Sequence, residues 1–411
     1  MRQLPTPSPA EAADWTHREL GDLAFGDWHD PGMRGGQTSA DAALAAFSVV
    51  GYAARRNEVW PAARRGSSGL SPYIRHGLLS LPAVWQAVAG GPARDVEKFH
   101  DELLWQEYAR HLYARLGGAT RRSLRFSVPE HDDGPAGPGA GRPWSGEEAC
   151  LREAREELST RGWLTNQQRM WLASHWSVRS GLGWREGEDL FFRQLLDGSR
   201  AANRLGWQWT IGALTGKQYG FSRWQVEKRA PGLCAACPLE RRCPIQQWPP
   251  EEPLPPRVSV DPRIRRDDDL ATTAGPVQPE QRGRPEAVWL TAESLGDEDP
   301  AMLANPDLPA VFVFDEVLLT RLRLAPMRLL FLAECLADLA QRRTLEVWRG
   351  DPVAVLADRA VATTFTPVPG WRSRALRVGP VEIHPWRWLR RPHPGPLTSF
   401  TAWSRSAASR A

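Results

Sequence analysis

The sequence predicts a mainly α-helical protein with a smaller α/β unit near its C-terminal end. Between residues 162 and 216, apolar and aromatic residues recur at helical spacing. Within this stretch, Asp197, Gly198 and Ser199 are typical of a helix end followed by an N-cap. After residue 285, runs of β-branched and aromatic residues alternate with a helical segment over 326–341, which favours a parallel sheet.

The composition is that of a large globular protein. The chain has 411 residues, of which 42% are hydrophobic and 24% charged, enough for two domains. Its start is polar and proline-containing, and no apolar run reaches membrane-spanning length, so we expect a cytoplasmic protein without a membrane partner. Nearly all basic residues are arginines, which suit phosphate recognition, but a GC-rich genome gives the same bias. The net charge of +4 is modest, so it neither indicates nor excludes a nucleic-acid partner.

Two segments in the first half of the chain combine polar and aromatic residues. The loop over 66–73 is rich in serine and precedes a helix start, where backbone N–H groups suit a pyrophosphate, although an ordinary turn has the same composition. Further on, Phe99, Glu102 and Gln106 share one face of a predicted helix, with Trp105 on its edge.

The segment 162–216 presents a chemically mixed surface. Asn166, Arg169 and Met170 fall at i, i+3 and i+4, so an amide, a cation and a thioether share a helix face. Apolar and aromatic helix is expected to continue for sixteen residues beyond them. Structural alternatives are open: Met170 as core filler, and Arg169 with Asp197 as an ion pair.

Four of the five cysteines form a candidate metal shell. Cys234, Cys237 and Cys243 are clustered, and Cys150 opens a helix far upstream. Such a set suits an iron–sulfur cluster or a tetrahedral zinc ion, and a disulfide framework is not expected in a cytosolic chain. Cys335 lies in an apolar helix and is expected in the core.

The segment 162–216 resembles the flavin-binding helical domain of the cryptochrome/photolyase family. The resemblance rests on Gly162-Trp-x-x-Asn-x-x-Arg-Met170, the unbroken Trp184-Arg-Glu-Gly-Glu188, and Asp197-Gly-Ser-x-Ala-x-Asn-x-x-Gly-Trp-Gln-Trp209. It implies a helical FAD-binding domain over 1–248, a linker over 249–285, a Rossmann-like, antenna-like α/β domain over 286–390, and a tail over 391–411. Because the antenna domain opens the chain in photolyases, this order implies a circular permutation.

The resemblance also assigns roles to individual residues. FAD would be bound by Tyr52, Ser67, Ser68, Leu70, Ser71, Phe99, Arg169, Asp197, Ser199 and Asn203. The substrate side of the flavin would be formed by Glu102, Trp105, Asn166, Met170 and Trp209. Trp207 and Trp184 match the two inner members of the family's electron-transfer chain, and Trp144, Trp171 or Trp176 would replace the third. The segment 126–144, where the third member is expected, has the composition of a loop.

The cysteine pattern is similar to that of the iron–sulfur branch of this family. Cys150 stands sixteen residues before Asn166, as in that branch, so the resemblance assigns Cys150, Cys234, Cys237 and Cys243 to a [4Fe–4S] cluster, with zinc as the alternative. An antenna chromophore is a further expected cofactor of unknown identity, since the antenna-like domain is short.

The function that the resemblance implies is light-driven repair of cyclobutane pyrimidine dimers, with electron transfer from reduced FAD to damaged DNA, single-stranded DNA included. The alternative is a cryptochrome-like photoreceptor with a protein partner, or a redox flavoprotein without repair. Gln106 and Gln167 favour this alternative, because repair enzymes usually carry arginines there to reach the DNA. The helix of Asn166 carries no histidine pair, which argues against repair of the (6-4) lesion.

Overall fold

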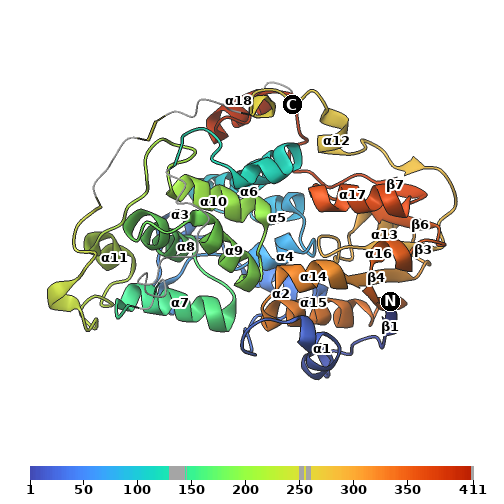
Figure 1. The fold of residues 1–411 in the computed structure, drawn as a ribbon, viewed down its shortest axis with the longest axis horizontal. Helices are drawn as coiled ribbons and strands as arrows, with labels where there is room; N and C mark the ends of the chain where they lie inside the picture. Colours follow the sequence, from blue (N-terminus) through green and yellow to red (C-terminus); the bar gives the residue numbers. More distant parts are fainter. Residues whose placement is uncertain (129–143, 145, 250–253, 256–260, 409–411) are drawn as a thin grey trace.

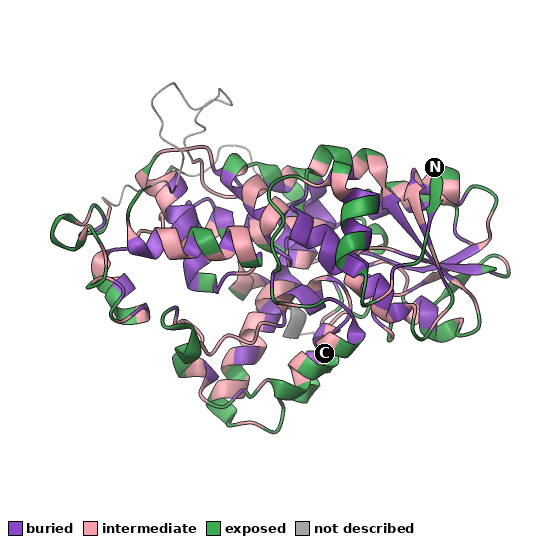
Figure 2. Cartoon of the chain, turned by 90° about the horizontal axis from the view of Figure 1, so that it is seen from below, coloured by how far each residue is buried: buried purple, intermediate pink, exposed green. Residues whose placement is uncertain are grey.

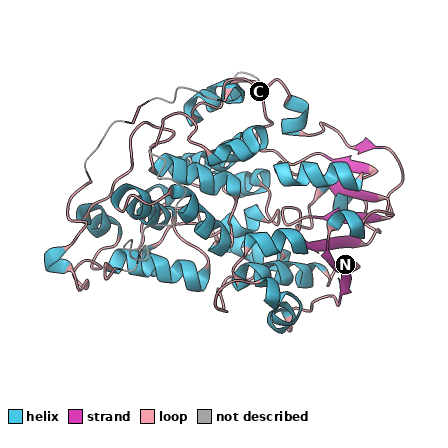
Figure 3. Cartoon of the chain, in the orientation of Figure 1, coloured by secondary structure: helices cyan, strands magenta, loops and turns pink. Residues whose placement is uncertain are grey.

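The computed structural model describes residues 1–128, 144, 146–249, 254–255 and 261–408. A helical part occupies one side of the molecule and a seven-stranded sheet the other (Figures 1 and 3). Most of the loop expected over 126–144 lies outside the described residues.

Five parallel strands form the centre of the sheet, and four of them confirm the strands predicted after residue 285. They are β3 (Ala287–Leu290), β4 (Ala310–Asp315), β5 (Leu345–Gly350), β6 (Val361–Thr364) and β7 (Glu382–His384). Their order is β5-β4-β3-β6-β7, so successive connections run outward in both directions from β3, as in a doubly wound sheet. This order places a crevice at the carboxyl ends of β3 and β6.

Helices cover both faces of this sheet and join it to the helical part. They are α13 (Pro300–Ala304), α14 (Glu316–Leu322), α15 (Pro326–Leu339), α16 (Pro352–Val355) and α17 (Pro369–Val378). Helix α15 is mostly apolar and is buried along most of its length. It packs against α1 (Ala12–Leu20), α2 (Gln37–Ala46) and α9 (Trp184–Gln194), and so connects the two parts.

The helical part is built around α6 (Ala93–Leu116) and α10 (Arg200–Thr210), which pack against each other (Figure 1). Its other α-helices are α3 (Tyr52–Arg55), α4 (Ser71–Arg75), α5 (Leu81–Ala87), α7 (Ala149–Arg161), α8 (Asn166–Ala173) and α11 (Arg223–Arg229). Short 3-10 turns lie at η1 (Gly21–Leu23), η2 (Ala62–Arg64), η3 (Gly117–Arg121), η5 (Glu240–Arg242) and η6 (Pro262–Ile264).

Helix α8 is shorter than expected from the sequence. It begins with a reciprocal capping box between Thr165 and Gln168, but the α-helix ends at Ala173. A π-helical turn, η4 (Ser174–Arg179), replaces the expected continuation. The helix therefore continues only to Arg179, so the prediction of sixteen further helical residues was too long, and the apolar pattern alone does not reveal the widened turn.

Three segments near the expected domain boundaries differ from the sequence-based division of the chain. Strand β1 (Arg2–Leu4) belongs to the sheet rather than to the helical part, because it pairs antiparallel with the free edge of β5. The expected tail over 391–411 contains α18 (Phe400–Ala408), which packs on α6. The expected linker over 249–285 contains α12 (Leu270–Ala274) and β2 (Glu280–Gln281), which pairs antiparallel with β7.

The largest hydrophobic cluster crosses from the helical part into the sheet. It contains residues of α4, α6 and α15 together with strand residues of β3, β4 and β5. Figure 2 shows buried residues concentrated where the two parts meet. In the described portion of the chain, no helix has the length and apolar character needed to cross a membrane.

Candidate functional site

A cavity of about 940 Å³ lies between the helical part and the sheet. Side chains of α6, α8 and α10 line it from one side, and the carboxyl ends of β3 and β4, together with the segment after β6, line it from the other. Its volume is in the upper range of pockets that hold cofactors and other small molecules. The cavity therefore offers space for a large ligand next to the crevice of the doubly wound sheet.

Helix α8 presents Asn166, Arg169 and Met170 to this cavity, as the sequence spacing predicts. The Asn166 amide lies 3.5 Å from the Met170 sulfur. The Arg169 guanidinium donates to a carboxylate oxygen of Asp197 at 2.8 Å, so the expected ion pair is present. The Asp197 side chain is only 7% exposed, so loss of its partner Arg169 would leave a buried carboxylate without a compensating charge and would destabilise the loop.

The loop between α9 and α10 holds Asp197 and Ser199 at the cavity. The Ser199 hydroxyl accepts from the backbone N–H of Ala201, which confirms the expected N-cap. The carbonyl of Gly198 between them accepts from Arg75 and Arg328, both at 3.1 Å. A Cβ atom at Gly198 would lie 2.6 Å from the Phe192 carbonyl oxygen, so the loop requires glycine here.

Asn203 lies one turn into α10 with its amide oriented by a buried carboxylate. Its side-chain nitrogen donates to the backbone oxygen of Glu188 at 2.8 Å and to the Glu188 carboxylate at 3.0 Å. Burial raises the pKa of Glu188, while Arg200 and Arg204 oppose the rise. Arg200 also donates to Glu188 at 2.7 Å.

The serine-rich loop and α3 complete one end of the cavity. Tyr52, Ser67, Ser68 and Ser71 all line it. Burial raises the pKa of Tyr52, and the nearby Glu102 carboxylate adds to the rise, so the phenol stays protonated. The Ser71 hydroxyl accepts from the indole N–H of Trp163 at 3.2 Å.

Glu102 and Trp105 reach the cavity from α6. The Glu102 carboxylate is 37% exposed and pairs with Arg56 at 3.3 Å and with Lys98 at 3.5 Å. Trp105 and Trp209 supply aromatic surface, and Trp209 lies 5.4 Å from Tyr219, ring to ring. The Glu102 carboxylate can accept hydrogen bonds, and the indole rings of Trp105 and Trp209 offer flat apolar surface. Together they suit a planar ligand that carries N–H donors.

Several polar atoms of the cavity wall lack protein partners. Within the part of the chain that the structure describes, these buried atoms include Asp197 Oδ1, Gln167 Oε1 and Trp207 Nε1. Buried polar groups are normally hydrogen-bonded, so these atoms fit a polar ligand in the cavity.

Part of the chain that lines this cavity is similar to known proteins. A family model described as the FAD binding domain of DNA photolyase matches residues 149–228. The deoxyribodipyrimidine photo-lyase of Synechococcus sp. is 29% identical over 220 residues, which cover 46% of this chain and 42% of that protein. The protein of the same name from Thermus thermophilus is 32% identical over 205 residues, covering 44% of this chain and 45% of its own length. Residues 149–228 are therefore similar to the FAD binding domain of DNA photolyase, and the longer matches are to proteins named deoxyribodipyrimidine photo-lyase.

The similarity to these family members is partial in length. The chain spans less than half the length of these two photo-lyases. A crystal structure of a Synechocystis sp. cryptochrome aligns with 51% of this chain and 45% of that chain, at 20% identity and a TM-score of 0.43.

Three residues assigned by family resemblance do not line the cavity. Leu70 is 0% and Phe99 3% exposed, and Phe99 packs edge-on against Tyr52 at 4.9 Å. Trp184 is also buried outside the lining, on the helix whose Gly187 faces the Trp207 ring. The other residues proposed for FAD and substrate all line the cavity.

Aromatic rings extend from Trp207 into the helical part. Trp207 lies 6.5 Å from Trp176, and Trp176 lies 4.9 Å from Trp144, ring centre to ring centre. Trp171 instead stacks on Phe221 at 5.9 Å. Of the three candidates for the third electron-transfer position, Trp176 and Trp144 are thus connected to Trp207 by ring contacts.

Cys150, Cys234, Cys237 and Cys243 come together although they are distant in sequence. All four line one small cavity of about 20 Å³ beside α7, and all are free thiols. Among the described residues, no group of three or more His, Cys, Asp or Glu side chains is arranged to hold a metal ion. The four thiols thus supply a suitable donor set, but not a preformed coordination shell. Cys335 lies in the core, as expected.

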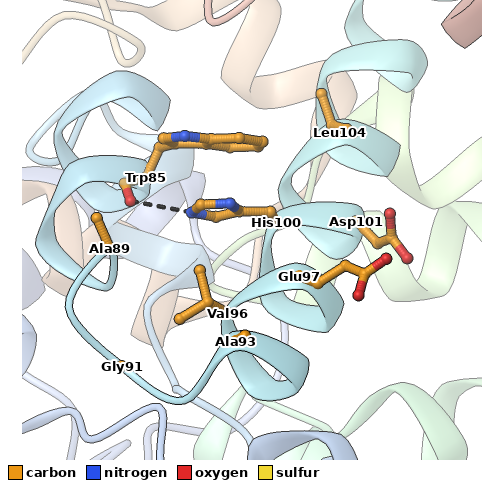
Figure 4. A pocket seen from close by; sticks show the side chains of 9 residues that line it. All are labelled: Trp85, Ala89, Gly91, Ala93, Val96, Glu97, His100, Asp101 and Leu104. Carbon is orange, nitrogen blue, oxygen red and sulfur yellow. Dashed lines mark hydrogen bonds between the residues drawn. The ribbon is translucent and has the colours of Figure 1, made fainter.

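A second, open cavity of about 500 Å³ lies between α5 and α6 (Figure 4). Trp85 and His100 stack in it at 3.4 Å, and the His100 Nε2 atom is 3.1 Å from the Trp85 carbonyl oxygen. Glu97 and Asp101 point away from this stack (Figure 4). None of the residues assigned to FAD or substrate lines this cavity.

Besides Arg169, seven arginines in the described part of the chain line the main cavity that the sequence motifs did not reveal: Arg56, Arg75, Arg110, Arg200, Arg204, Arg328 and Arg374. Arg328 is buried, and burial lowers its pKa to about 9. Its guanidinium reaches from α15 to the carbonyl oxygens of Phe192 and Gly198. An arginine among the apolar residues at the start of a mostly apolar helix was the available signal.

Proposed function

We propose that this protein binds FAD in the main cavity and uses blue light to repair cyclobutane pyrimidine dimers in DNA. The main support is that a single cavity brings the two groups of residues together. Arg169, Asp197 and Asn203 line it as the expected flavin-side residues, and Glu102 and Trp105 line it as the expected substrate-side residues. When bound and reduced, FAD supplies on illumination the electron that opens the cyclobutane ring, and the electron returns after splitting.

The substrate-side residues would bind a dimer flipped out of the DNA. Trp105, Trp209 and Met170 offer apolar surface for the two bases, and Asn166 offers an amide at the edge of the same space. The Glu102 carboxylate would accept hydrogen bonds from the pyrimidine edge. Its pair with Arg56 holds the carboxylate in place and provides a cation for the DNA backbone.

The flavin-side residues would orient the cofactor. The pair between Arg169 of α8 and Asp197 of the α9–α10 loop fixes two opposite charges at the cavity, and Asn203 is held by Glu188. Ser67, Ser68, Ser71 and the phenol of Tyr52 would donate to the phosphates, while Ser199 closes the loop at α10. Leu70 and Phe99 would support this end of the cavity from the core behind it.

We propose that Trp207 donates electrons to the flavin site and that Trp176 and Trp144 continue the path. Their ring contacts support this route. Trp184, which family resemblance places second, has no such ring contact with Trp207 among the described pairs.

We propose a [4Fe–4S] cluster at Cys150, Cys234, Cys237 and Cys243. The shared cavity and the free state of the four thiols support it. The residues would supply four thiolate ligands. Zinc is the competing occupant, and metal analysis separates the two.

The α/β part is proposed as an antenna-like domain over 286–390, after a helical domain over 1–248 and a linker over 249–285. The late position of the doubly wound sheet in the chain supports a circular permutation. The strand ends at the cavity would hold the antenna chromophore, whose identity the residues do not specify.

A second candidate function is a blue-light photoreceptor that does not repair DNA. Gln106 and Gln167 support it, because both line the cavity where arginines would strengthen DNA binding. Such a protein would use the same flavin site and pass its light-dependent change to a protein partner.

Repair by the purified, photoreduced protein tests the proposal. A single-stranded oligonucleotide with one thymine dimer is illuminated with blue light, and the loss of the dimer is followed by chromatography. We expect repair by the wild type and strong loss of repair in Glu102→Ala with normal flavin content. Flavin that changes redox state in light without any repair would refute the repair function and favour the photoreceptor.

A further inference from the structure

The end of the chain forms a strap across α6. Residues 386–408, here called the C-terminal strap, follow β7 and end in α18, which lies beside α6 in Figure 1. The ring of Phe400 in α18 stacks on the ring of Trp105 with centroids 4.2 Å apart and an interplanar angle of 8°. A residue near the end of the chain therefore covers one face of a side chain that lines the main cavity.

Buried polar side chains of α6 anchor the strap through its backbone. Glu107 accepts from the N–H groups of Leu389 and Arg390 at 2.6 and 3.1 Å. The hydroxyl of Tyr108, the next residue of α6, donates to the Leu397 carbonyl at 2.8 Å. These contacts fix the path of the strap before it reaches α18.

The helix α18 itself is fixed by Trp403, which is 0% exposed. Its indole N–H donates to His111 Nδ1 at 2.9 Å, so the other ring nitrogen of His111 carries the hydrogen and donates to the Arg390 carbonyl at 2.9 Å. Burial lowers the pKa of His111 to about 3, which keeps this neutral tautomer in place at ordinary pH. The ring centres of Phe400 and Trp403 are 5.6 Å apart, so the buried Trp403 lies directly beside the Phe400 ring that stacks on Trp105.

Trp105 has only one face left for a ligand. It lines the cavity whereas Phe400 does not, and the stack with Phe400 covers one face of the indole. Tyr108 meets both rings edge-on, at 5.8 and 6.0 Å, and limits their rotation. The strap thus determines how the indole faces the cavity.

We propose that Phe400 is a positioning residue of the substrate site, which holds Trp105 ready to stack on a base of the dimer. This inference rests on the proposed repair function. An aromatic pair of this geometry contributes enough that its loss weakens base stacking by about two- to tenfold. The effect falls on binding, because Phe400 does not touch the flavin-side residues.

Binding of a dimer-containing single-stranded oligonucleotide, measured by fluorescence anisotropy in the dark, tests the proposal. Phe400→Leu keeps an apolar side chain without the ring, Phe400→Tyr keeps the ring, and Phe25→Leu is the matched control under Arg323. We expect weaker binding only in Phe400→Leu, with unchanged flavin content and photoreduction. If the wild type does not bind the dimer, the repair function fails; if the wild type and Phe400→Leu bind equally, the positioning role fails.

A readout on Trp105 itself does not depend on DNA. In protein labelled with 5-fluorotryptophan, the Trp105 resonance is identified by its loss in Trp105→Phe. We expect Phe400→Leu to shift and broaden this ¹⁹F resonance and Phe400→Tyr to restore it. An unchanged Trp105 resonance, or tighter dimer binding by Phe400→Leu, would overturn the proposal, since tighter binding means that α18 competes with substrate.

Discussion

Replacement of Glu107 by glutamine is expected to remove a pH dependence of stability. The Glu107 side chain is fully buried, and this burial raises its pKa to about 7, against the opposing effects of Arg110 and the two strap N–H groups. The folded protein therefore keeps a proton on Glu107 at pH values where the unfolded chain has released it. For this group the free energy of unfolding falls as the pH rises through the window from the ordinary carboxyl pKa to about 7.

The size of the effect follows from the shift. A change from 4.5 to about 7 corresponds to about 3 kcal/mol of unfolding free energy, lost between mildly acidic and neutral pH. Glu107→Gln keeps an oxygen acceptor for Leu389 and Arg390 but does not titrate. Relative to the wild type, the variant should therefore gain about 3 kcal/mol between pH 4.5 and pH 8.

Urea unfolding followed by circular dichroism at several pH values measures this difference. Glu97→Gln on the exposed side of the same helix is the matched control and should follow the wild type. Parallel stability curves for the wild type and Glu107→Gln would show that Glu107 is ionised in both states, and the reasoning from burial would be wrong.

Three other predictions concern the main cavity and the cysteines. Asp197→Asn leaves Arg169 without its carboxylate, so flavin affinity should fall by about tenfold or more, measured by titration of the apoprotein with FAD. Trp176→Phe should slow photoreduction without lowering flavin content, measured by flash illumination with an external reductant. Cys237→Ser should lower bound iron per chain while flavin content persists, measured by iron and sulfide analysis.

Each of these predictions has its own control. Asp189→Asn should leave flavin affinity near that of the wild type, and equal loss in both variants would contradict a specific role for Asp197. Photoreduction at the wild-type rate in Trp176→Phe, with the exposed Trp224→Phe as reference, would exclude the ring path. Zinc rather than iron in the wild type, or iron unchanged by Cys237→Ser but lost in Cys335→Ser, would contradict the cluster assignment.

Local sequence patterns predicted the secondary structure that the main site uses. The i, i+3, i+4 spacing placed Asn166, Arg169 and Met170 on one face of α8, and the cap at Ser199 set the start of α10. The four strands after residue 285 followed from their β-branched and aromatic composition. The helix after Asn166 was overextended, because the π-helical turn leaves no simple mark in the apolar pattern.

By itself, then, the sequence determined most of the local elements and the flavin-type motifs that resemble those of photolyases. Only the tertiary structure decided that β1 joins the sheet, that Arg328 reaches the Gly198 loop from α15, and that Phe400 stacks on Trp105. These contacts join residues separated by more than a hundred positions, so no local periodicity encodes them. They arise because buried donors, edge strands and aromatic faces must find partners once the two parts of the molecule pack together.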